Sequence, residues 1–173
     1  GVPATGAGTA TGATDATDAV AVPAASRTWA PAPVATGWPP RSREEFVAAL
    51  WPHAVAAGRA LGVDPTAIVS HAALETGWGR SLPVQAGGAT SYNLFGVKAG
   101  GGWQGPAAVA DTVEFERGRE VTRTERFRAY GSLAESLGDY TRLIAGSPRY
   151  AAALNAGADV GAYAAALQRA GYA

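Results

Sequence analysis

The sequence predicts an α+β domain that is mainly helical and carries one small antiparallel β-hairpin. Two segments with helix-capping signals and apolar residues at helical spacing lie between residues 42 and 77. A segment of alternating side chains follows at residues 109 to 127, and further capped apolar segments lie after it. This order predicts a helical lobe, a hairpin lobe and a cleft between them.

Composition excludes several classes of function. The 173 residues are enough for one domain without disulfide or metal staples, and 14 basic residues balance 14 acidic ones. We therefore expect no nucleic-acid partner. The absence of cysteine excludes a disulfide framework and a cysteine nucleophile. Because the sequence contains no run of about 20 apolar residues, we expect no membrane insertion.

Residues 1–41 are interpreted as a linker. They consist mainly of Ala, Gly, Thr and Pro and show neither the helical nor the strand period. Trp29 and Trp38 are the residues most suited to anchor this segment. The chain begins at Gly1 without a basic and apolar leader, so we interpret it as a processed piece. Residues 42–173 are then the folded domain.

The first two helices are predicted from their caps. Ser42 and Glu45 form a capping box, and a helix from there to about Leu61 places apolar residues on one face. Asp64 and Pro65 begin a second helix that ends at Gly77. Glu75 therefore lies in the last turn of a mostly buried helix.

The second half of the domain is predicted from alternation and from further caps. Residues 77–105 are rich in glycine and aromatics and resemble the wall of a site. Residues 109–116 and 121–127 form a hairpin that turns at 117–119. Helices begin after Ser132, at Ser147 and after Asp159.

A pair of carboxyl groups is the candidate catalytic arrangement in this sequence. Cleavage of a glycosidic bond requires a protonated carboxyl as acid and usually a carboxylate on the other side of the sugar. Glu75 lies at the carbonyl end of its helix, where the dipole disfavours a negative charge, and Trp78 follows it. Glu114 projects from the polar side of the hairpin, so it suits the role of the second carboxyl group, which stays ionised. Alternation places Glu116 on the same side and does not separate the two.

Several aromatic and polar side chains suit either substrate binding or packing in the core. Trp78, Tyr92 and Trp103 suit either sugar stacking or a core, whereas Phe95 is assigned to the core. Asn93 suits an acetamido contact or a turn. His53 and His71 are too few to form a catalytic metal site, so we expect neither a metal nor a cofactor.

Ordered sequence blocks carry a resemblance to a known family. The blocks are His71-Ala-Ala-Leu-Glu-Thr-Gly-Trp-Gly79, Ser91-Tyr-Asn-Leu-Phe-Gly-Val-Lys98, Thr112-Val-Glu-Phe115, Phe127-Arg-Ala-Tyr130 and Ala170-Gly-Tyr-Ala173. Over residues 42 to 173 the chain closely resembles the FlgJ-type flagellar peptidoglycan hydrolases of the lysozyme-like glucosaminidase family. The resemblance implies a lysozyme-like fold and an endo-β-N-acetylglucosaminidase that cuts the glycan strands of peptidoglycan.

The resemblance also implies roles for individual residues. Glu75 corresponds to the proton donor and Glu114 to the second acid, which either activates water or leaves attack to the substrate's acetamido oxygen. Tyr172 corresponds to an assisting hydroxyl; because the chain stops at Ala173, where family members continue, we expect Tyr172 to be weakly held. Substrate-binding roles are expected for Trp78, Tyr92, Asn93, Trp103, Tyr130 and Tyr140.

The resemblance places the action in the periplasm, where the wall is opened for the flagellar rod. Rod proteins would then be partners through an N-terminal domain absent from this chain. Two rival functions stay open. One is an N-acetylmuramidase or lytic transglycosylase acting on the other linkage, and the other is a non-catalytic peptidoglycan-binding module.

Overall fold

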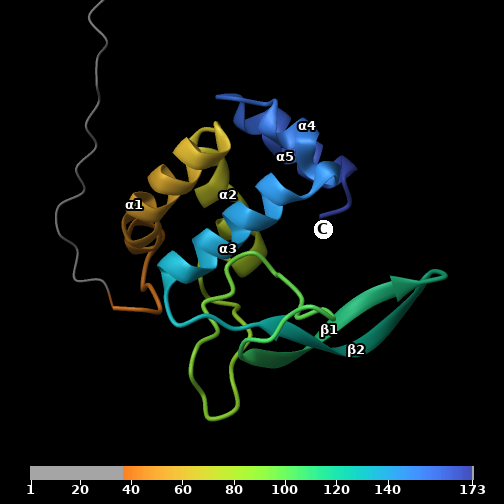
Figure 1. Cartoon of the computed structure of the whole chain (residues 1–173). Helices are drawn as coiled ribbons and strands as arrows, with labels where there is room; N and C mark the ends of the chain where they lie inside the picture. The colour runs from red at the N-terminus through yellow and green to blue at the C-terminus, as the bar shows by residue number, and fades with distance from the viewer. Residues whose placement is uncertain (1–36, 173) are drawn as a thin grey trace, which may run out of the picture. The chain divides into compact units, whose positions relative to one another are not determined.

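The structure, a computed structural model, describes residues 37–172, so most of the predicted linker, including Trp29, lies outside the described residues. The elements agree with the predicted α+β order (Figure 1). In chain order they are α1 (Arg43–Leu61), α2 (Pro65–Thr76), β1 (Ala107–Glu116), β2 (Arg119–Arg128), α3 (Leu133–Gly146), the 3-10 turn η1 (Pro148–Tyr150), α4 (Ala151–Leu154) and α5 (Val160–Arg169).

Capping side chains fix where the helices begin and end. The Ser42 hydroxyl accepts the backbone N–H of Glu45 at 3.1 Å, and the Asp64 carboxylate accepts that of Thr66 at 2.7 Å. Each such cap stabilises a helix by about 1 kcal/mol. Gly62 and Gly77 end α1 and α2 with φ of 70° and 55°. The predicted bounds of the first two helices are confirmed.

The core lies among the helices. α1 packs against α2 and α3, and α2 also contacts α5. Figure 1 shows α3 in front of α2. The blue helices α4 and α5 lie beyond the C-terminal end of α3. Phe46, Leu50, Ile68, Leu137 and Ile144 are at most 2% exposed. Within residues 37–172, no single helix is long and apolar enough to cross a membrane; the bent pair of α1 and α2 meets that test together.

The hairpin is regular, and both its strands are ten residues long. Glu114 pairs with Val121, and the turn at Arg117 and Gly118 has φ of 51° and 78°. Cross-strand partners share a face. The face of Thr112 and Glu114 is half-buried, while on the other face Val113 and Phe115 are 60% and 73% exposed. Alternation is as predicted, but the polar face is the one turned towards the rest of the domain.

The segment between α2 and β1 is held from both sides. The carbonyl of Ser91 accepts the N–H of Tyr130 at 2.8 Å, and Lys98 forms a β-bridge with Phe127 at the end of β2. Trp38 also packs against this segment, with its ring centroid 5.9 Å from that of Tyr92. Trp38, at the end of the segment interpreted as a linker, thus packs on the domain as an anchor.

Candidate active site

Glu75 lies in the last turn of α2, and its side chain is 23% exposed. The helix ends immediately afterwards because Gly77 adopts a left-handed conformation that glycine allows without strain. The carboxyl group is therefore partly buried at the carbonyl end of the helix while one side remains open. A carboxyl in such a place is suited to exchange a proton with a bound molecule.

His71 contacts Glu75 from one turn earlier in the same helix. Its Nε2 lies 3.3 Å from Oε1 of Glu75, and its Nδ1 lies 3.0 Å from the hydroxyl of Tyr140. The hydroxyls of Tyr140 and Tyr163 are 2.6 Å apart. Burial raises the pKa of both tyrosines, so both hydroxyls keep their protons at neutral pH. A line of polar groups thus extends from Glu75 through α3 to α5.

Tyr172 closes the site at the C-terminal side. Its hydroxyl donates to the carbonyl of Phe95 at 2.8 Å, and its ring packs edge-on against His71 with centroids 4.6 Å apart. Burial, followed by the nearby charge of Glu75, raises the pKa of Tyr172 well above its usual value. Tyr172 is therefore held firmly, contrary to the expectation from the sequence, and its hydroxyl is a neutral donor.

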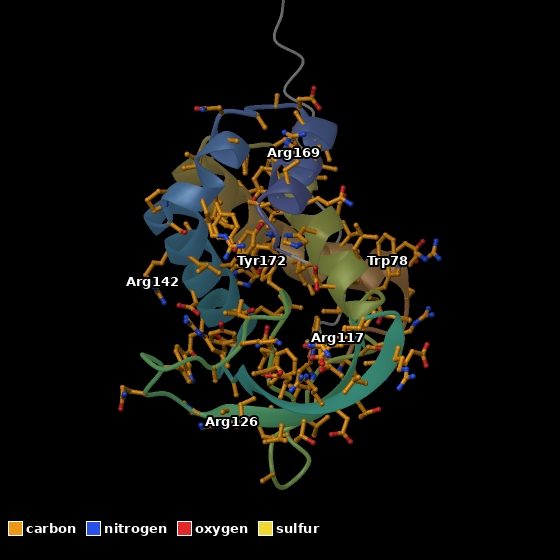
Figure 2. The ribbon with its side chains drawn as sticks, turned by 90° about the vertical axis from the view of Figure 1, so that its right-hand side faces the viewer. Trp78, Arg117, Arg126, Arg142, Arg169 and Tyr172 are labelled. Atoms are coloured by element: carbon orange, nitrogen blue, oxygen red, sulfur yellow. The ribbon has the colours of Figure 1, made fainter. Side chains whose placement is uncertain are left out.

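A pocket of about 530 Å³ opens beside Glu75 between α2 and α5. Glu75, His71 and Tyr172 line it together with the apolar side chains of Leu74 and Leu167. Leu74 is 82% exposed, which leaves this wall open. Figure 2 shows Tyr172 near the middle of the view, beside α2. The pocket therefore brings together two of the predicted catalytic residues.

Gly96 approaches the other oxygen of Glu75. It has a φ of 60°, and a Cβ atom at this position would lie 3.2 Å from Oε2 of Glu75. Glycine thus serves two needs here, a left-handed backbone and room for the carboxyl group. Oε1 lies 3.3 Å from Nε2 of His71, while Oε2 faces Gly96.

Replacing Gly96 with Ala is expected to lower stability by about 1–2 kcal/mol, because an L residue is strained at this φ. Activity on peptidoglycan, the substrate that the family resemblance implies, is expected to fall by roughly tenfold more than stability explains, because the methyl displaces Oε2. Gly62→Ala is the matched control: its φ is 70°, and a Cβ there meets nothing within 4 Å. Urea unfolding and initial rates on both variants would check this; equal activities would contradict it.

Glu114 belongs to a cluster of charges on the hairpin. The Lys98 ammonium donates to Oε1 of Glu114 at 3.2 Å, and Arg123 Nε lies 3.6 Å from Oε2. The hydrogen bond to Glu114 raises the pKa of Lys98. Glu116 forms its own pair with Arg123. Glu114 is not among the residues that line the pocket beside Glu75, but Lys98, its partner, is two residues beyond Gly96.

Asn93 and Tyr140 are placed inside the domain. Asn93 is 1% exposed; its amide donates to the carbonyls of Val97 and Arg128, and its oxygen accepts the N–H of Val97. Tyr140 is fully buried and stacks on Phe95, with centroids 3.8 Å apart. Because neither side chain offers surface to a ligand here, both shape the site from behind. Phe95, 1% exposed, is in the core as predicted.

The remaining aromatic candidates lie in separate places. Trp78 packs edge-on against Phe46 beneath Arg43 and is not among the residues that line the pocket with Glu75. Figure 2 shows Trp78 at the edge of the domain, away from Tyr172. Tyr92 packs against Trp38.

Trp103 and Tyr130 form a second aromatic group near α3. Their rings meet edge-on with centroids 5.8 Å apart, and both line a pocket of about 430 Å³. Tyr130 is 6% exposed and donates its hydroxyl to Asp139 at 2.7 Å, so Trp103 is the more accessible of the two.

His71 and Gly96 are site residues that sequence reasoning missed. The spacing of four residues between His71 and Glu75 was the available signal, because it places both side chains on one face of a helix. Gly96 carried no local signal of its contact with Glu75, since α2 and the loop meet only in the folded chain.

The chain matches known proteins over the same region as the described domain. A family model named Glucosaminidase, described as mannosyl-glycoprotein endo-β-N-acetylglucosaminidase, matches residues 51–173. Peptidoglycan hydrolase FlgJ of Pseudomonas aeruginosa is 44% identical over 132 residues, which are 76% of this chain. The chain spans only 33% of the length of that relative.

Solved structures agree with the sequence relatives. A mutant peptidoglycan hydrolase from Sphingomonas sp. A1 is 47% identical with a TM-score of 0.71, over 76% of this chain and 84% of that one. The glycoside hydrolase domain of Salmonella typhimurium FlgJ is 39% identical with a TM-score of 0.62, over 76% and 78%. With most of its length matched by the family model and by these folds, the chain belongs to the Glucosaminidase family.

Proposed function

We propose that this chain is an endo-β-N-acetylglucosaminidase that hydrolyses the glycan strands of peptidoglycan. The observation that carries the proposal is the carboxyl group of Glu75, partly buried at the end of α2 and held in the wall of a pocket by His71. The family match supports the class of reaction, and the peptidoglycan hydrolases among the relatives support the substrate.

In the proposed reaction, protonated Glu75 donates its proton to the glycosidic oxygen as the bond to the anomeric carbon breaks. Glu114 is the proposed second acid. It accepts from Lys98 and contacts Arg123, and as a carboxylate it stabilises positive charge on the sugar or activates water. Where the acetamido oxygen of the substrate attacks instead, Glu114 acts by electrostatics alone.

Tyr172 is proposed to assist as a neutral hydroxyl beside Glu75, a role that its raised pKa supports. Substrate contacts are proposed for Trp103, for Tyr92 and Trp78, and for the edge of Tyr130. Aromatic rings suit the apolar faces of sugars. Asn93 and Tyr140 are proposed to act by positioning, because both are buried.

The products identify the reaction. Purified peptidoglycan treated with the chain is expected to release fragments with reducing N-acetylglucosamine ends, measured by mass spectrometry. Reducing N-acetylmuramic acid would instead show a muramidase, and its anhydro form a lytic transglycosylase. Binding to peptidoglycan without any release would favour the non-catalytic wall-binding module.

We further propose that the whole protein acts in the periplasm and opens the wall for the flagellar rod, with rod proteins as partners through a part outside this chain. The FlgJ relatives support this proposal. In a flagellated host, a Glu75→Gln allele is expected to reduce the number of flagella seen by electron microscopy. Normal flagellation in cells whose only copy is this allele would contradict the proposal.

A further inference from the structure

The turn after α5 leads the chain back to the candidate site. Ala170 caps the end of α5, Gly171 follows with a φ of 70°, and Tyr172 then lines the pocket beside the proposed acid. The N–H of Gly171 donates to the carbonyl of Gln168 at 2.9 Å. The N–H of Tyr172 donates to the carbonyl of Leu167 at 3.1 Å. These two bonds form a Schellman motif, which ends a helix at a left-handed residue.

A side chain from another part of the chain binds the carbonyl groups of this turn. Nε of Arg149, in η1, donates to the carbonyl of Ala170 at 3.1 Å. Its Nη2 donates to the carbonyls of both Ala170 and Gly171, the latter at 3.1 Å. The direction of each bond is fixed, because a guanidinium has five N–H donors and no acceptor. Arg149 therefore ties the turn after α5 to a segment 21 positions earlier.

Tyr150 adds a second contact between the same two segments. The guanidinium carbon of Arg149 lies 5.2 Å from the ring centroid of Tyr150. Tyr150 is 6% exposed, and its ring centroid is 5.7 Å from that of Tyr172. The side chain of Tyr172 thus packs on the neighbour of Arg149, while Arg149 itself binds the backbone just before Tyr172.

The position of Tyr172 depends on its backbone as well as on its side chain. Its hydroxyl donates to the carbonyl of Phe95, and its ring packs on His71. Residues 170 to 172 belong to no helix or strand, and such a segment keeps one position only where contacts tie it down. Because Arg149 binds the backbone from which the ring projects, its loss would let the hydroxyl move relative to Glu75.

We infer that Arg149 is a positioning residue for the proposed reaction, which clamps the turn after α5 and so holds the hydroxyl of Tyr172 beside Glu75. This inference rests on the proposed function, in which Tyr172 assists. Arg149 is not among the residues that line the pocket with Glu75, so it acts through Tyr172. Its loss is expected to lower kcat and to leave KM unchanged, because substrate contacts are kept.

Arg149→Met removes the donors of the clamp but keeps an unbranched stem. With peptidoglycan as substrate, kcat is expected to fall by roughly tenfold, because a small displacement of an assisting group slows the chemical step. The matched control is Arg169→Met. Arg169 is exposed in the last turn of α5, so this substitution removes the same charge near the same helix end. Its kcat is expected to equal that of the parent, and an equal loss in both variants would overturn the inference.

A double substitution tests whether Arg149 acts through Tyr172. Tyr172→Phe alone is expected to lower kcat by roughly tenfold or more, because the assisting hydroxyl is gone. In that background, Arg149→Met is expected to change kcat by less than about twofold, since the group that it positions is already absent. A purely structural role would produce no such coupling. A full loss in both backgrounds would overturn the inference.

Amide hydrogen exchange tests the clamp without substrate. The N–H of Tyr172 is bonded to Leu167, and its exchange is expected to be roughly tenfold faster or more in Arg149→Met. The N–H of Tyr163, bonded to the carbonyl of Asp159 at 3.0 Å at the start of α5, is the reference and is expected to be unchanged. Unchanged exchange at Tyr172 would overturn the inference. Faster exchange at both amides would also overturn it, because α5 as a whole would then be opening.

The two proposals fail differently. If the parent cleaves peptidoglycan and Glu75→Gln does not, but Arg149→Met keeps the parental kcat, the proposed reaction stands and the positioning role falls. If Tyr172→Phe keeps the parental kcat, Tyr172 has no part in the reaction and the positioning role falls with it. If the parent shows no cleavage, the proposed function falls, and faster exchange at Tyr172 then describes a structural contact only.

Discussion

Replacing Glu75 with Gln is expected to lower kcat on peptidoglycan by on the order of 10²–10⁴-fold, because an amide cannot donate the proton that the leaving oxygen needs. The substitution is nearly isosteric, and the introduced amide still offers an oxygen to His71. Folding is therefore expected to be unchanged. Initial rates of fragment release, with unfolding curves for both proteins, would check the result.

Glu120→Gln is the matched control for this experiment. Glu120 lies on the exposed face of the hairpin opposite Phe115, away from the face that carries Glu114. Its rate is expected to equal that of the parent. If Glu75→Gln retained the parental rate, or if both substitutions lowered it equally, Glu75 would not be the acid.

The second large effect concerns stability and centres on Asp139 in α3. This side chain is buried and accepts hydrogen bonds from Tyr130 at 2.7 Å and from Arg128 at 2.8 Å, with Arg142 at 3.3 Å. It thereby ties the end of β2 and the residues after it to the helices. Asp139→Ala is expected to lower the free energy of unfolding by about 3 kcal/mol, because it leaves buried donors without their acceptor.

The pH dependence of this effect follows from the pKa of Asp139. Burial alone would raise it, but the hydrogen bonds from Tyr130 and Arg128, with the charges of Arg128 and Arg142, outweigh burial and hold the pKa below its usual 3.8. A carboxyl whose pKa is lowered by folding contributes stability above its unfolded pKa and loses it as pH falls through the folded value. The parent and Asp139→Ala should therefore differ fully at pH 7 and less below about pH 4.

Urea unfolding at pH 7 and at pH 3 would measure both differences. Asp111→Asn is the control, because Asp111 is exposed on the hairpin and accepts only from Thr124 among the described residues. It is expected to unfold like the parent at both pH values. A difference between the parent and Asp139→Ala that grew as pH fell would contradict the assignment.

Local chemistry explains why much of the fold was predictable. The caps at Ser42, Asp64 and Ser132 act within three residues of the helices they begin, so the sequence shows both partners. Alternation likewise predicted the strands of the hairpin. It did not predict which face packs inwards, because a period of two residues defines two faces without saying which meets the domain.

In the candidate site, too, some features follow from neighbouring residues and others from contacts between residues far apart in the sequence. Glu75 was identifiable because the end of its helix and its motif are contiguous in the sequence. The contact between His71 and Tyr140 joins residues 69 positions apart, and that between Tyr172 and Phe95 joins residues 77 apart. No local pattern encodes such pairs.

The sequence by itself thus determined the helices, the hairpin and the family, and it predicted Glu75 as the acid of the proposed site, since each rests on neighbouring residues or on ordered motifs. Only the tertiary structure decided that Asn93 and Tyr140 are internal, that Tyr172 is held against His71, and that Gly96 borders one oxygen of Glu75. The physical reason is that burial and hydrogen-bond direction depend on which distant elements pack together, and packing exists only once the chain has folded.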